Sequence, residues 1–148
     1  LIDLRKCFEF LSRDLLWKSC HDHGYPMHVA RMSMQSYAWP RLIRGGYDFC
    51  GKAVVVSRGI VAGSPFATTE LKVYLVPLAR HLQASSGQAL CLSIFVDDFP
   101  ISTFNSENEA VAETSTTTYK KVVRGLCDIQ LVVAPRQNRI YFLVQGPH

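Results

Sequence analysis

The sequence predicts an α+β fold, an antiparallel sheet with helices packed on one face, accompanied by a small β-ribbon. Short runs of strand-forming residues alternate with longer amphipathic runs along the chain. Two apolar runs, ALCLSIFV (89–96) and FPISTF (99–104), flank an aspartate pair and predict a hairpin. With 148 residues, 48% of them hydrophobic, the chain is long enough for one domain with a real core and too short for two comfortable ones.

The first part of the chain predicts a strand end followed by two helices. Residues 1–4 are expected to end a strand. The run 11–24 predicts a helix with Ser12 as its N-cap, because serine side chains accept hydrogen bonds from the first free amides of a helix. The run 27–39 predicts a second helix that stops before Pro40, since the residue before a proline disfavours helical geometry.

The middle of the chain predicts a ribbon and a long helix. RLIRGGYDFCGKAVVV (41–56) is expected to form a β-ribbon with Gly45–Gly46 at its turn. A long helix is expected over 66–83, with Pro65 in its first turn and Pro77 kinking it. After the hairpin, the pattern predicts a helix and a final strand pair, over 107–124, 129–133 and 139–144.

Composition limits the classes of function. The net charge is +4, from 16 Lys+Arg against 12 Asp+Glu, which suits an anionic partner without identifying one. No apolar run approaches the length of a membrane span, and the start lacks a signal-peptide pattern, so an intracellular protein is expected. The cysteines are odd in number and widely spaced, which favours buried, reduced thiols over a disulfide framework.

Asp97 and Asp98 follow an apolar strand directly, and this placement has two interpretations. Aspartates in a surface turn can simply accept hydrogen bonds from nearby backbone amides. Alternatively, the hairpin pairs with the first strand, which brings Asp3 to the same place. Three carboxylates at one point can hold two divalent cations and support phosphoryl transfer.

Three segments resemble, in order and at suitable spacing, successive palm motifs of reverse transcriptases, most closely those of non-long-terminal-repeat retrotransposons. They are DLRKCFE (3–9), SRGIVAGSPFATTELKVYL (57–75) and FVDD (95–98). The resemblance covers nearly the whole chain. It implies a polymerase palm over 1–148, with a ferredoxin-like antiparallel sheet, and part of the fingers at about 40–56.

The resemblance implies roles for the acidic residues. Asp3 matches the first metal-binding aspartate, and Asp97 and Asp98 match the doublet of the aromatic-x-Asp-Asp motif. These three residues would be catalytic and would hold two Mg²⁺ ions, with Mn²⁺ as an alternative metal. Leu4 would add its backbone carbonyl to one metal.

The resemblance also implies a nucleotide site. Phe8 matches the aromatic steric gate, where a rigid ring leaves no room for a 2′-hydroxyl and so selects deoxynucleotides. The loop residues Arg58, Ala62 and Gly63 would contact the substrate, and Gly59 and Gly63 would allow close backbone approach. The helix start after Ser64 would offer amide donors to anionic groups.

The implied function is RNA-directed DNA polymerisation, with an RNA template, a DNA primer and dNTPs as partners. Most of the fingers and the thumb are expected to lie outside this segment, which is then inactive alone; a eukaryotic retroelement would place the protein in the nucleus. The alternative is an inactive retroelement remnant or nucleic-acid-binding module, favoured by Ala62 in place of the family's Gln and by Gln137 near its usual Lys. A third possibility, an RNA-templated RNA polymerase, is opposed by Phe8 and by FVDD.

Overall fold

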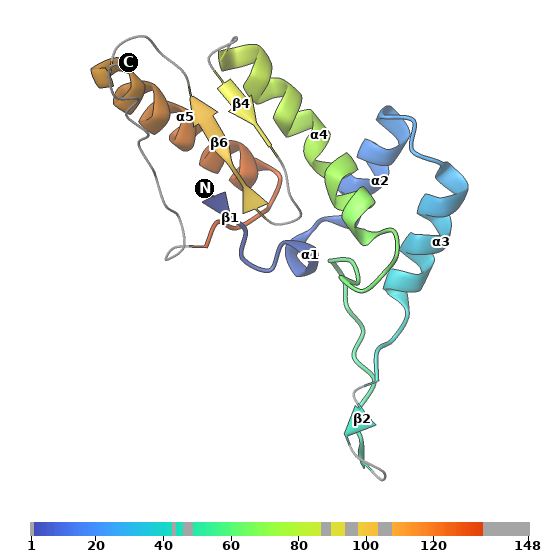
Figure 1. The fold of residues 1–148 in the computed structure, drawn as a ribbon. Helices are drawn as coiled ribbons and strands as arrows, with labels where there is room; N and C mark the ends of the chain where they lie inside the picture. The colour runs from blue at the N-terminus through green and yellow to red at the C-terminus, as the bar shows by residue number, and fades with distance from the viewer. Residues whose placement is uncertain are drawn as a thin grey trace. The chain divides into compact units, whose positions relative to one another are not determined.

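A computed structural model of the chain shows short antiparallel strand pairs and five helices among the residues that it describes (Figure 1). This mixture of helix and strand agrees with the predicted α+β class. The described residues are 2–42, 44–45, 49–86, 90–93, 98–103 and 108–134.

The chain divides into two compact units, which are described separately. One unit comprises Phe8–Tyr74, and the other comprises Leu1–Cys7 together with Leu75–His148. The division separates the predicted site residues. Asp3, Leu4 and Asp98 belong to the split unit, and the predicted steric gate and glycine loop belong to the continuous one.

The continuous unit, Phe8–Tyr74, is built on two helices that the sequence predicts. Helix α2 spans Arg13–Asp22 and is capped by Ser12, whose side chain accepts a hydrogen bond from the Leu15 amide. Helix α3 spans Met27–Ala38 and ends before Pro40 as expected. The buried side chains of this unit include Leu11, Leu16, Cys20, Ala30, Tyr37, Ile60 and Leu71.

The predicted ribbon is present in the same unit. Strand β2, Arg44–Gly45, pairs antiparallel with β3, Phe49–Cys50, and Arg41 bridges Val54 closer to the helices. Gly45 pairs with Phe49, so it belongs to the strand rather than to the turn. Gly46 lies outside the described residues.

Helix α4 spans Ala67–Ser86, and Pro77 lies inside it, as the sequence predicts. Pro77 is exposed, so its ring projects toward solvent while Leu75 and Leu78 are buried beside it. Pro65 precedes the first helical residue by two positions.

The split unit contains the strands that carry the acidic residues. Strand β1, Ile2–Asp3, pairs antiparallel with β5, Asp98–Phe99. On the other side of β1, the Arg5 amide donates to the Val132 carbonyl and the Ala134 amide donates to the Asp3 carbonyl. The first strand is therefore flanked by chain on both edges.

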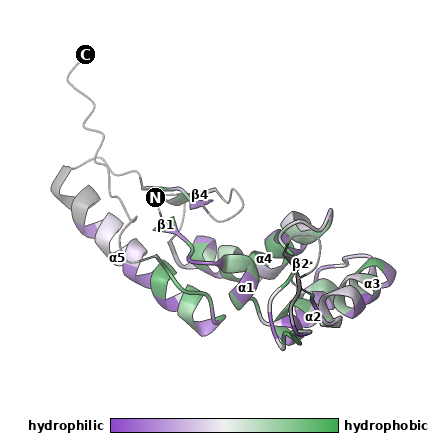
Figure 2. Cartoon of the chain, turned by 90° about the horizontal axis from the view of Figure 1, so that it is seen from below, coloured by the Kyte–Doolittle hydropathy of each residue, from purple (hydrophilic) through white to green (hydrophobic). Residues whose placement is uncertain are grey.

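The predicted hairpin forms beside helix α5, Asn108–Asp128 (Figure 1). Strand β4, Leu90–Leu92, pairs antiparallel with β6, Ile101–Thr103, and the Ser93 amide donates to the Pro100 carbonyl. Thr118, Val122 and Leu126 recur every four residues along α5 and are buried, the spacing of a helix with one packed face, and Figure 2 shows hydrophobic and hydrophilic residues together on this helix.

Several details differ from the expectations. A short helix α1, Cys7–Phe10, was not predicted. The stretch 129–133 is not a strand, because Ile129 and Gln130 form a turn after α5 and only Val133 makes a bridge, to Leu4. The expected strand 139–144 lies outside the described residues. Cys7 and Cys20 are buried thiols as expected, whereas Cys91 and Cys127 are exposed thiols, so the expectation of burial is wrong for these two.

Candidate functional site

Asp3 and Asp98 lie directly opposite each other across the β1–β5 pair. Their neighbours Ile2 and Phe99, also paired with each other, are each 1% exposed and form part of the core. Because successive side chains of a strand point to opposite faces, the two carboxylates share the face that is turned away from this core. Both aspartates are partly exposed.

The register brings these two carboxylates close together. The Asp3 carbonyl is used by the Ala134 amide, on the edge away from β5. Asp3 and Asp98 therefore form a non-hydrogen-bonded antiparallel pair, in which the Cα atoms are about 4.5 Å apart and the side chains are closest. By the same alternation, the backbone carbonyl of Leu4 is directed to the β5 side of the strand.

Two opposed carboxylates on one sheet face suit a divalent cation. Like charges directly across a strand pair repel, and Mg²⁺ prefers carboxylate and carbonyl oxygens as ligands. Asp97, the third expected ligand, lies outside the described residues. Within the described ranges, no group of three His, Cys, Asp or Glu side chains is placed to hold a metal.

The predicted glycine loop is bound to the segment that carries Phe8. The Ile60 amide donates to the Phe8 carbonyl at 2.8 Å, and the Gly59 amide donates to the Leu11 carbonyl at 2.8 Å. These carbonyls lie at the end of α1, where a helix leaves its acceptors unsatisfied. The backbone is thus fixed against the loop at Phe8 and at Leu11.

Gly59 is the glycine that this contact requires. It has a φ of +80°, and a Cβ there would lie 2.5 Å from the backbone oxygen of Glu9. Gly63 has nothing within 4 Å of the position where its Cβ would be. Gly63 therefore makes no comparable approach to another described part of the chain, and its proposed approach to a nucleotide stays a prediction.

The tip of the loop is exposed. Ile60 is 2% exposed and anchors one end, whereas Ala62 and Gly63 are exposed. Arg58, expected to contact phosphate, is also exposed, and its guanidinium carbon lies 4.7 Å from the centroid of the Phe10 ring. This cation–π contact orients the guanidinium beside α1 and leaves it open to solvent.

At the start of α4, where the resemblance implies amide donors for anionic groups, two amides bind within the chain. The Phe66 amide is directed at the Ser64 hydroxyl, 3.4 Å away, and the Ala67 amide donates to the Ser64 carbonyl at 3.1 Å. These two donors are therefore already used within the chain. Pro65 has no amide hydrogen to offer.

A buried polar pair behind the loop was not identified from the sequence. The Tyr37 hydroxyl donates to Oε2 of Glu70 at 2.7 Å, and Glu70 is fully buried in the first turn of α4. Burial, and then the charge of Glu70, raises the pKa of the Cys20 thiol to about 11. Burial also raises the pKa of Tyr37, to about 12.

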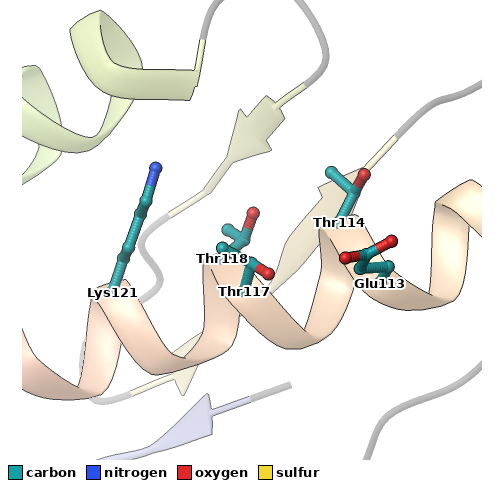
Figure 3. A pocket seen from close by; sticks show the side chains of 5 residues that line it. All are labelled: Glu113, Thr114, Thr117, Thr118 and Lys121. Atoms are coloured by element: carbon teal, nitrogen blue, oxygen red, sulfur yellow. The ribbon is translucent and has the colours of Figure 1, made fainter.

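A shallow pocket lies along α5 in the split unit (Figure 3). It holds about 280 Å³ and is lined by Glu113, Thr114, Thr117, Thr118 and Lys121. Figure 3 shows Thr114, Thr118 and Lys121 projecting from the same side of the helix. Among them, Thr118 is buried, Thr114 is half-buried and the other three side chains are exposed.

Comparison with known proteins gives no assignment. No protein-family model matches the chain, and no significant match is found among curated proteins. Within the described residues, no helix has the length and apolar character needed to cross a membrane.

Proposed function

We propose that this chain is the palm segment of a reverse transcriptase, which transfers deoxynucleotides to a primer 3′-hydroxyl on an RNA template. The observation that carries the proposal is the opposition of Asp3 and Asp98 across β1 and β5. These residues come from two sequence motifs some ninety positions apart, and strand pairing brings them to one sheet face.

A second observation supports the same assignment. The motif loop that contains Gly59 and Ile60 is hydrogen-bonded to the backbone at Phe8 and Leu11, which follows the first motif. The loop tip at Ala62 and Gly63 is exposed and accessible to a ligand. The net charge of +4 suits a polyanionic template and primer.

In the proposed reaction, the primer hydroxyl attacks the α-phosphate of a dNTP, a phosphodiester bond forms and pyrophosphate leaves. Asp3 and Asp98, with Asp97, would hold two Mg²⁺ ions, and the carbonyl of Leu4 would supply a further oxygen. When held by these residues, Mg²⁺ would lower the pKa of the attacking hydroxyl and would offset charge on the phosphates. The chain itself positions the reactants, which is most of what phosphoryl transfer asks of a protein.

Primer extension tests the catalytic residues. The assay uses a longer polypeptide that restores the fingers and thumb, an RNA template, a DNA primer and Mg²⁺. Asp3→Asn, Asp97→Asn and Asp98→Asn are expected to lower extension by orders of magnitude. Asp128→Asn removes an exposed carboxylate at the end of α5 and should leave extension unchanged. Equal activity in all four variants contradicts the assignment.

Sugar selection tests the assigned role of Phe8. Phe8→Ala is expected to admit ribonucleotides, since the ring would otherwise exclude the 2′-hydroxyl. Trp17→Ala, at an exposed aromatic on α2 outside the proposed site, serves as the control and should keep the preference for deoxynucleotides. The readout is the ratio of kcat/KM for dATP and ATP in each variant. If the ratio is unchanged in Phe8→Ala, the ring does not select the sugar and serves only in packing.

A further inference from the structure

We infer that Arg13 is a positioning residue for the incoming nucleotide, because its guanidinium holds the chain that leads into the exposed loop tip. The inference rests on the proposed function. Arg13 is the first residue of α2, and all its acceptors belong to the same unit, Phe8–Tyr74.

The side chain of Arg13 binds main-chain carbonyls from two distant segments. Its Nε donates to the Gly59 carbonyl at 2.8 Å, and Nη1 donates to the Val56 carbonyl at 2.9 Å. Its Nη2 donates to the Tyr37 carbonyl at 2.7 Å and more weakly, at 3.3 Å, to that of Arg58. One planar group therefore ties the segment 56–59 to the end of α3.

The chemistry of this contact requires arginine. A guanidinium presents five N–H donors in a rigid plane, so it reaches acceptors in several directions at once. A lysine ammonium is a compact point charge and cannot span the same acceptors. The carbonyl of Tyr37 lies in the last turn of α3, where the helix dipole also favours a cation.

The contacts fix both ends of the loop tip. On one side, Arg13 binds the carbonyl of Gly59, the residue before Ile60. On the other side, the Tyr37 hydroxyl binds Glu70 in the first turn of α4. Tyr37 contributes to both contacts, so the end of α3 is a common frame from which the exposed residues 61–63 extend.

This arrangement predicts an effect on nucleotide binding rather than on chemistry. The carboxylates assigned to metal binding lie on β1 and β5, and none of the Arg13 contacts involves those strands. Loss of the guanidinium releases the segment 56–59 from the end of α3, so the loop is held beside Phe8 only by the amides of Gly59 and Ile60. In the proposed site, this change weakens the surface on which the dNTP is held.

Arg13→Gln and Arg13→Lys test the inference against Arg31→Gln, which removes the same charge from an exposed position on α3. Primer extension by the longer polypeptide gives KM for dNTP and kcat. Both Arg13 variants are expected to raise KM about tenfold, because the loop tip that would hold the dNTP is less firmly positioned, and to leave kcat within about threefold. Arg31→Gln should match the unchanged protein.

Amide exchange provides a second, independent readout. The Gly59 and Ile60 amides should exchange faster in both Arg13 variants and at the normal rate in Arg31→Gln, while far-UV circular dichroism checks that each variant is folded. Normal extension with an unchanged KM in both Arg13 variants overturns the role of Arg13 alone. A lower kcat with an unchanged KM would mean that Arg13 supports the fold and does not position the nucleotide, which also overturns the inference. No extension by the unchanged protein overturns the proposed function, and the inference with it.

Discussion

Gly59 is a position where the main chain leaves no room for a side chain. Its φ of +80° lies in the left-handed region, and the carbonyl of Glu9 occupies the space that a Cβ would need. Both factors act on the same residue, and the obstacle is backbone rather than the flexible end of a side chain. The loop can approach α1 this closely only with glycine there.

Gly59→Ala is expected to lower the free energy of unfolding by about 2–4 kcal/mol, the combined cost of a left-handed alanine and a displaced contact. Gly63→Ala is the matched control, since open space surrounds that position, and it should change stability by less than about 0.5 kcal/mol. Urea unfolding measures both variants. Similar losses in the two would contradict the assignment of the close approach to Gly59.

Because of Cys20, the free energy of unfolding is expected to fall at alkaline pH. Burial, and secondarily the charge of Glu70, raises the pKa of this thiol from 9.0 to about 11. A raised pKa favours the neutral thiol in the folded state. The contribution of the neutral Cys20 thiol to the free energy of unfolding is therefore fully present below pH 9. It declines as the thiol ionises in the unfolded chain, and it is lost above about pH 11.

Between pH 8 and pH 11 this group should account for a stability loss on the order of 2 kcal/mol. Cys20→Ala should remove that part of the pH dependence, although it lowers stability at pH 8 by leaving a small cavity. Cys127→Ala, at an exposed thiol, should keep the slope of the unchanged protein. Parallel slopes for both variants would contradict the role of Cys20. Urea unfolding at several pH values provides the measurement.

Among the elements, α4 contains a proline in its interior and still continues to Ser86. Proline lacks the amide that would bond one turn back, and its ring crowds the preceding turn. Pro77 is exposed, so replacing it removes little packing.

Pro77→Ala is expected to stabilise the chain by about 1 kcal/mol, because a restored helical bond outweighs the greater freedom of the unfolded chain. Thermal unfolding, followed by circular dichroism at 222 nm, tests this expectation. Lys72→Ala, at another exposed position of the same helix, is the control and should change stability by less than about 0.5 kcal/mol. If Pro77→Ala is less stable than the unchanged protein, the proline ring makes packing contacts that stabilise the fold despite its exposure.

The elements that the sequence predicted well carry local signals. Ser12 before an acidic first turn marks the start of α2, and Pro40 marks the end of α3, since both effects act within a few residues. Helix α1 has only four residues, too few for a periodic pattern. The stretch 129–133 is rich in strand-forming residues. However, α5 continues to Asp128, so no extended residues precede this stretch.

The candidate site was predictable only in part, for a similar reason. The opposition of Asp3 and Asp98 follows from strands whose apolar patterns are visible in the sequence. The contacts of Arg13 were not predictable, because their acceptors are main-chain carbonyls 24 to 46 positions away, and a carbonyl is common to every residue. The contrast between Gly59 and Gly63 likewise depends on the tertiary approach of Glu9.

At the scale of the whole molecule, metal binding would distinguish the proposed polymerase palm from the alternative of a remnant that keeps only the sheet. A remnant has no reason to retain two carboxylates opposed on one sheet face. In the metal-free chain such a pair costs stability through repulsion. A bound divalent cation removes that cost and adds stability that grows with its concentration.

The two effects have opposite signs, and this makes the prediction specific. Without metal, Asp3→Asn and Asp98→Asn should each be slightly more stable than the unchanged chain, because one of the two repelling charges is gone. With Mg²⁺ or Mn²⁺ at about ten times the dissociation constant, the unchanged chain should gain about 1.4 kcal/mol and both variants should gain little. Asp128→Asn should gain as much as the unchanged chain. Thermal unfolding with and without the metal measures each difference, and equal gains in all four proteins would place the bound metal away from β1 and β5.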